Sequence, residues 1–207
     1  MSNTLKLIQT LGSKICHDLA GSIGTIDNCL GLLDSENKII GAQAKDLVLE
    51  ESKNLVKRIK FLRSTYGLVE NESMLSIVEM VDILRKFFED TKINFNAHIM
   101  GDLLSVDAHM AKVAYSLVSI ASENIGLEGE IDLYINEKNN TLFKIQSTGR
   151  KLHLKHGSFA VLDGDITEPL TITNCREHYA SNICSEHGYK LAISENAEFM
   201  EYFVIKG

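Results

Sequence analysis

One short stretch of the sequence, residues 13–28 (S-K-I-C-H-D-L-A-G-S-I-G-T-I-D-N), combines residue types that can do nucleophilic chemistry. Its imidazole, His17, is followed directly by Asp18, whose carboxylate can accept a hydrogen bond from one ring nitrogen and leave the other as a nucleophile. In a helix, His17 lies about 200° around the axis from both Ile15 and Leu19. His17 is therefore expected to face solvent, away from the apolar side. The simpler alternative is a surface histidine without a role.

Small and polar residues continue along the same stretch. Gly21 and Ser22 follow His17 by one turn, and Gly24, Thr25 and Asn28 come next. Each glycine inside a helix costs about 1 kcal/mol relative to alanine, so two of them call for an explanation. Close packing of helices is one explanation, but Gly21 lies on the side of His17. The pattern favours a docking surface that the backbone of another protein can approach.

Two long amphipathic helices are expected to position these residues. Apolar residues recur at steps of three or four in the first helix: Ile8, Leu11, Ile15, Leu19, Ile23, Ile26, Leu30 and Leu33. After turn-forming residues, a second run has the spacing of a left-handed bundle: Val48, Ser52, Leu55, Ile59, Leu62 and Tyr66. Because an isolated pair of helices covers such stripes poorly, a four-helix bundle made by two copies is the economical solution. Residues 1–68 are predicted to form this antiparallel dimerisation hairpin.

From residue 69 the pattern changes to helices interleaved with strands. Helices are expected near 76–89, 109–123 and 174–187, and strands near 92–99, 131–136, 142–147, 190–194 and 199–205. Turn residues at 138–140 would join the second and third of these strands, 131–136 and 142–147, into a hairpin. This order predicts an α/β sandwich over residues 69–207, with one sheet covered by helices. The fold class is α+β.

The charges of the 207 residues are divided unevenly between these two parts. The whole chain has 21 basic and 28 acidic residues, a net charge of −7. Residues 1–68 hold 9 basic and 7 acidic residues (+2), which leaves 12 basic and 21 acidic (−9) for residues 69–207. An acidic chain without a basic stripe is a poor nucleic-acid binder. The absence of long apolar runs and the four scattered cysteines predict a cytoplasmic protein without a membrane span.

The stretch I-C-H-D-L followed by G-T-I-D-N-C-L-G-L-L-D resembles the phosphoacceptor helix of the alphaproteobacterial ChpT-type histidine phosphotransferases and, more distantly, the H-box of sensor histidine kinases. The segment R-I-K-F-L-R-S-T-Y-G, residues 58–67, resembles the end of the second helix in the same phosphotransferase family. The pattern departs at Ser22, where both families usually carry proline. Loss of that proline is expected to straighten the helix below His17.

A sensor kinase would need a nucleotide site in the second part of the chain. The sequence motifs of such a site are missing. Ser116 and Ile120 stand where the kinase pattern places asparagines that hold magnesium, and an isoleucine offers no oxygen ligand. No G-x-G occurs anywhere in the sequence, and D-G-D at 163–165 is expected to be a turn. The resemblance implies a kinase-like sandwich that has lost its ATP chemistry, so no cofactor of its own is expected.

A second group of residues suggests a metal site, which the spacing disfavours. Cys175, His178, Cys184 and His187 form C-x2-H twice. On one helix, Cys175 and Cys184 are nine residues apart, or about 900°, and so lie on opposite sides. No metal site is predicted from these four residues.

The resemblance implies a phosphorelay shuttle in which His17 takes a phosphoryl group from one receiver-domain aspartate and passes it to another. Asp18 would orient the imidazole or act as a base, and Lys14 could screen the phosphoryl charge. The expected partners are a second copy of the chain, the receiver of a hybrid histidine kinase as donor and response-regulator receivers as acceptors, which would supply the magnesium. The alternatives are a histidine kinase with a divergent ATP site and a non-catalytic scaffold that binds receivers.

Overall fold

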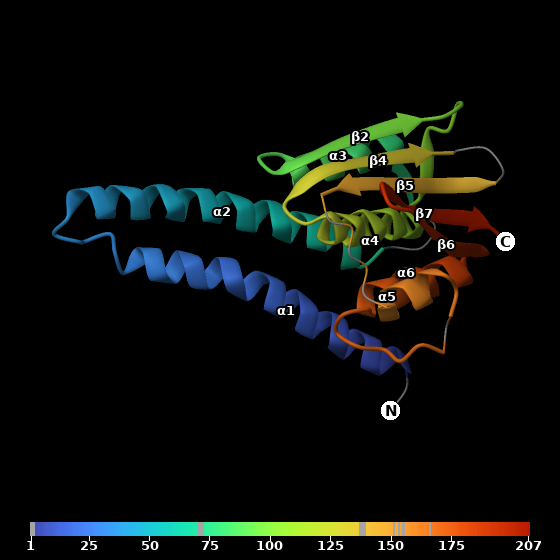
Figure 1. Ribbon diagram of the computed structural model, residues 1–207, viewed down its shortest axis with the longest axis horizontal. Helices are drawn as coiled ribbons and strands as arrows, with labels where there is room; N and C mark the ends of the chain where they lie inside the picture. The colour runs from blue at the N-terminus through green and yellow to red at the C-terminus, as the bar shows by residue number, and fades with distance from the viewer. Residues whose placement is uncertain are drawn as a thin grey trace.

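A long helical hairpin forms the N-terminal part of the computed structural model, which describes residues 3–69, 73–136, 140–150, 152, 154, 156–165 and 167–207. Helix α1 (Asn3–Leu30) runs without interruption past Ser22, and α2 (Lys38–Tyr66) returns antiparallel to it (Figure 1). The side chain of Asn37 caps α2 by accepting a hydrogen bond from the Ile39 amide at 3.0 Å. The loop end of the hairpin projects away from the rest of the molecule.

The remaining elements form an α/β sandwich. In chain order they are β1 (Met74–Ser76), α3 (Ile77–Phe88), β2 (Lys92–Ile99), β3 (Ser105–Asp107), α4 (Ala108–Ile125), β4 (Glu128–Ile135), β5 (Thr141–Gly149), α5 (His156–Leu162), α6 (Cys175–Glu186), β6 (Tyr189–Glu195) and β7 (Phe199–Lys206). The main sheet has the order β2-β4-β5-β7-β6, in which β2 and β4 are parallel and the other neighbours antiparallel. Strands β1 and β3 form a separate small pair.

The core lies between this sheet and the helices that cover one of its faces. Side chains along β5 alternate between buried and half-buried, as expected for a sheet with only one face in the core. Helix α4 is buried along most of its length, and Tyr115, Phe143 and Tyr202 are among the largest side chains that are fully enclosed. The other sheet face carries polar residues such as Lys144 and Gln146.

Both helices of the hairpin contact the sandwich. Phe61 on α2 is 3% exposed, stacks on Phe87 of α3 at 4.0 Å between ring centroids, and meets the edge of Tyr115 on α4 at 5.9 Å. Near the start of α1, Leu7 and Leu11 pack against Cys175 at the start of α6. The hairpin is thus tied to the sandwich through α2 and through the first half of α1.

The predicted α+β architecture, a helical hairpin followed by an α/β sandwich, is confirmed. Three elements were not predicted, namely β1, β3 and α5, because segments of three to seven residues show too little periodicity. The turn expected at 138–140 lies largely outside the described residues. No helix in the described part of the chain is long and apolar enough to cross a membrane.

Candidate functional site

The predicted nucleophile lies in the middle of α1 and faces solvent. The His17 side chain is 80% exposed, and its Nδ1 atom lies 3.4 Å from Oδ1 of Asp18. Within the described residues, no hydrogen bond involves the other ring nitrogen, Nε2. The arrangement leaves Nε2 open to a reacting group from outside the chain, as the helical spacing predicted.

A row of alternating charges begins at Asp18 and crosses from the hairpin to the sandwich. Lys14 Nζ lies 2.9 Å from Oδ1 of Asp18 and 3.8 Å from Oε1 of Glu123 on α4. Glu123 in turn accepts two hydrogen bonds from the guanidinium of Arg176 on α6, one of them from Nη1 at 2.8 Å. Lys14 is therefore held between two carboxylates rather than free above His17. The row links the helix of His17 to α4 and α6 of the sandwich.

An open groove of about 430 Å³ separates His17 from the sandwich. Arg58 of α2 forms part of its wall and donates a hydrogen bond from Nη1 to the Asp18 carbonyl oxygen at 2.9 Å. The remaining walls come from α1, α2, α3, α4 and α6 and combine apolar with charged side chains: Leu11, Lys14, Ile15, Gly21, Phe61, Leu62, Tyr66, Phe87, Ser119, Ser122, Glu123 and Arg176. The groove gives the His17 side of the hairpin a concave border in which apolar and charged side chains are mixed.

The small residues beyond His17 leave an open surface. A methyl group added to Gly21 or Gly24 would meet no heavy atom within 4 Å, so packing within one chain requires neither glycine. Thr25 donates a hydrogen bond to the Gly21 carbonyl oxygen at 3.1 Å, and Asn28 is exposed. Ser22 is half-buried and lines a neighbouring groove between the hairpin and the sandwich. Gly21, Thr25 and Asn28 are thus exposed along α1, and half-buried Ser22 lies at the margin of this exposed surface.

The residues that replace the asparagines of the kinase pattern are enclosed in the core. Ser116 is fully buried and Ile120 is 2% exposed, so neither side chain faces the groove near His17. Residues 163–165 form a turn as predicted, with Gly164 at φ +93° and Asp165 accepting a hydrogen bond from the Thr167 amide at 2.8 Å. The groove side of α4 carries Ser119, Ser122 and Glu123 instead.

The four residues of the C-x2-H pair are placed apart. Cys175 is buried against α1, whereas Cys184 belongs to the main core under the sheet. His178 lines a groove beside the first turns of α1, and His187 lies beyond the end of α6. The two cysteines thus lie on different sides of α6, as the helical spacing predicted.

Glu123 and Arg176 were missed by the sequence analysis, although one signal was present. Glu123 is the single acidic residue of α4, a mostly apolar helix, and such a residue usually has a partner. Its partner lies 53 residues away and could not be identified without the fold. Burial tends to raise the pKa of the Glu123 carboxyl, but the hydrogen bonds and charge of Arg176, together with Lys14, outweigh burial and hold this pKa below its usual value.

Replacing Glu123 with glutamine is expected to make the free energy of unfolding vary less with pH in the acid range. Ionised Glu123 adds stability above its unfolded pKa of about 4.3, and this stability is lost as the pH falls through the lower folded pKa. At about pH 7, Glu123→Gln should lower the free energy of unfolding by about 1 kcal/mol or less, because solvent screens the half-exposed carboxylate. Urea unfolding at about pH 7 and about pH 3.5 measures this difference, which should be smaller at the lower pH. Glu198→Gln, which removes an exposed carboxyl before β7, serves as the control. An equal loss of stability for Glu123→Gln at both pH values would contradict the inference that ionised Glu123 stabilises the fold.

The fold is similar to those of a solved bacterial phosphotransferase and of histidine kinase catalytic domains. A solved bacterial phosphotransferase matches with a TM-score of 0.83 at 21% identity, covering 99% of this chain and 98% of the other. The catalytic domain of the histidine kinase ThkA matches with a TM-score of 0.50 at 17% identity, covering 65% of this chain and 94% of that domain. These likenesses establish the fold.

Among curated proteins, the chain is similar to the protein phosphotransferase ChpT of Brucella abortus (strain 2308). The two are 23% identical over 199 residues, which cover 95% of this chain and 93% of that protein. The chain matches no protein-family model. The similarity to a ChpT-type phosphotransferase therefore extends beyond the two motifs of the hairpin to both parts of the chain.

Proposed function

We propose that this chain is a phosphorelay histidine phosphotransferase that carries a phosphoryl group on His17. The observation that carries the proposal is an imidazole that is 80% exposed in the middle of a long helix, beside two glycines that nothing inside the chain requires. The similarity to ChpT over both parts of the chain supports the same activity. The exchange would take place in the cytoplasm between receiver domains.

Phosphoryl transfer would require little from this chain other than a well-positioned nucleophile. Nε2 of the neutral imidazole would attack the phosphorus of an aspartyl phosphate in line with the bond that breaks, and the aspartate would leave as a carboxylate. The proton on Nδ1 would remain there and donate to Asp18 Oδ1, which would favour the imidazolium that forms on transfer. The reverse attack by an acceptor aspartate would release the phosphoryl group. Receiver domains would supply the magnesium.

Partners would dock on the face that contains His17, Gly21, Gly24, Thr25 and Asn28. These residues lie within about 100° of one another around α1. Lys14 and Ser22 would border this face, and the Lys14 charge would act on the phosphoryl group from beside Asp18. The donor would be the receiver of a hybrid histidine kinase, and the acceptors would be response-regulator receivers.

The hairpin would form a four-helix bundle with a second copy. Apolar side chains of both helices remain exposed in the single chain, among them Ile8, Ile23, Leu30, Ile39, Leu47, Leu49, Val56 and Ile59. Burying each such side chain contributes roughly 1.5–3 kcal/mol. A second hairpin is the partner with matching helices, which would give two copies of His17 per dimer.

Phosphoryl transfer is tested by mixing the chain with a receiver that carries a radiolabelled aspartyl phosphate. The label should move to the chain in an acid-labile form, as expected for phosphohistidine, and then to a second receiver. Incubation with γ-labelled ATP alone should leave the chain unlabelled. Labelling by ATP would show a histidine kinase instead, and retention of the label on the first receiver would show a scaffold.

A further inference from the structure

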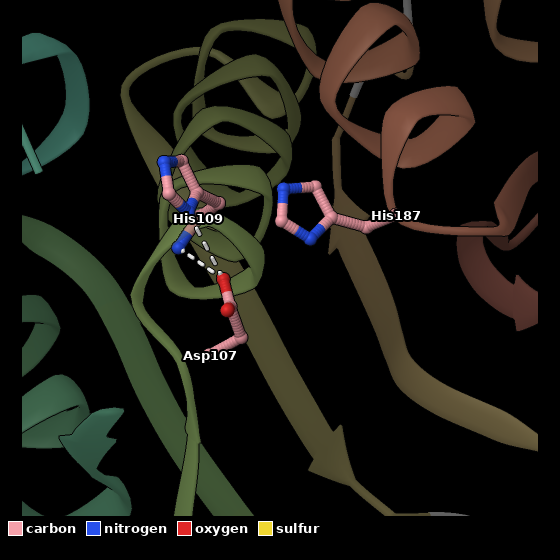
Figure 2. A group of neighbouring side chains, drawn as sticks. All are labelled: Asp107, His109 and His187. Atoms are coloured by element: carbon pink, nitrogen blue, oxygen red, sulfur yellow. Dashed lines mark hydrogen bonds and ion pairs between the residues drawn. The ribbon is translucent and has the colours of Figure 1, made fainter. Parts of the chain in front are cut away.

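Two histidines and an aspartate from separate parts of the chain meet at the start of α4. Asp107 and His109 begin this helix, and His187 follows α6 (Figure 2). One potential ligand atom from each lies within 4.8 Å of the others, and the rings of His109 and His187 are 4.9 Å apart between centroids. Figure 2 shows the His187 ring beside the Asp107–His109 pair, with no hydrogen bond to either.

The local structure presents the donor atoms toward one point. The Asp107 carboxylate caps α4 by accepting a hydrogen bond from the His109 amide at 2.7 Å, and the same oxygen lies 3.2 Å from Nδ1 of His109. Its second oxygen is not needed for the cap. Two imidazoles at this separation would repel each other as cations, whereas neutral rings offer lone pairs that a cation can bind. The group therefore has the donors of a metal site, and among the described residues no hydrogen bond holds the His187 ring in place.

We infer that Asp107, His109 and His187 form a binding site for a divalent transition-metal ion, with zinc as the best match. Two imidazoles and one carboxylate are a common zinc set, and a fourth position would remain for water. Calcium and magnesium prefer sites made mainly of oxygen ligands, and this site offers a single carboxylate.

Only a small rearrangement is needed to bind the ion. Donor atoms about 2.0–2.2 Å from zinc lie roughly 3.4 Å from one another in a tetrahedron, so gaps of up to 4.8 Å must close by no more than about 1.4 Å. The exposed His187 side chain can supply this movement by rotation about its side-chain bonds.

The ion would join the two helices that also hold the charge row near His17. Helices α4 and α6 run antiparallel, with Arg176 paired to Glu123 at one end and His187 beside His109 at the other. A metal at the second end would fix both ends of α6 against α4. The role assigned to the ion is structural, and it does not depend on the proposed phosphotransfer.

The test uses the full-length chain without an affinity tag, stripped of metal with a chelator and titrated with zinc chloride. One ion per chain should bind after dialysis. At about one hundred times the dissociation constant, Tm should rise by roughly 5–10 °C and return to its starting value with excess chelator. His187→Ala should lose this shift, while its Tm without metal should match that of the wild type, because the side chain is exposed.

Two further variants make the result specific. Asp107→Asn keeps a capping oxygen but loses the charge, so it should weaken zinc binding about tenfold or more without unfolding the helix. His98→Ala is the matched control, because His98 contacts a single carboxylate, Asp132, at 2.7 Å and should leave zinc binding unchanged. Absence of a Tm shift in the wild type, or an unchanged shift and stoichiometry in His187→Ala, would overturn the proposal.

Discussion

Replacing His17 with alanine is expected to abolish phosphoryl transfer and leave the fold intact. The rate at which label leaves a phosphorylated receiver should fall by more than about a thousandfold, because no other group can replace the nucleophile. The side chain is 80% exposed and its nearest polar contact is the 3.4 Å approach to Asp18. Substitutions at such positions usually change stability by about 0.5 kcal/mol or less. Tm should therefore change by no more than about 2 °C.

Two comparisons separate loss of the nucleophile from loss of docking. His98→Ala removes another partly exposed histidine, on β2, and should transfer at the wild-type rate. His17→Ala should still bind the receiver with the wild-type dissociation constant, because the glycines and polar residues around it are unchanged. Transfer by His17→Ala at the wild-type rate would assign the phosphoryl group to another residue and overturn the proposed function.

The position of His17 could be predicted because it depends only on the geometry of one helix. A step of two residues from Ile15 and Leu19 places it away from both, and each of these is half-buried whereas His17 is exposed. The same holds for the strands of the main sheet, whose alternation reflects a single buried face. Local periodicity was therefore sufficient to predict the buried side of a helix or strand wherever that element packs against a single surface.

The remaining features depend on contacts between distant segments. The first apolar stripe included Ile8, but Ile8 is 61% exposed and its neighbour Leu7 is buried, because the start of α6 packs on that side of α1. The charge row through Glu123 and the meeting of His109 with His187 likewise join residues that are far apart in the chain. No spacing rule connects such residues, so only the fold could identify them.

Replacing Phe61 with alanine is expected to cause the largest loss of stability on the hairpin. Phe61 is 3% exposed and packs between Phe87 of α3 and Tyr115 of α4, so its removal leaves a cavity where α2 meets the sandwich. Truncation of a buried phenylalanine costs about 3–5 kcal/mol. Urea unfolding at one fixed protein concentration measures this loss, because dimer formation would make stability depend on concentration.

The matched control for Phe61→Ala is Val78→Ala on α3, whose side chain is 74% exposed and should change stability by no more than about 0.5 kcal/mol. Calorimetry adds a second readout, because the hairpin and the sandwich share the Phe61 contact. In the wild type they should unfold in one transition, whereas in Phe61→Ala the hairpin should separate from the sandwich at a lower temperature. A loss below about 1 kcal/mol would mean that the hairpin docks mainly through α1 and its contacts with α6.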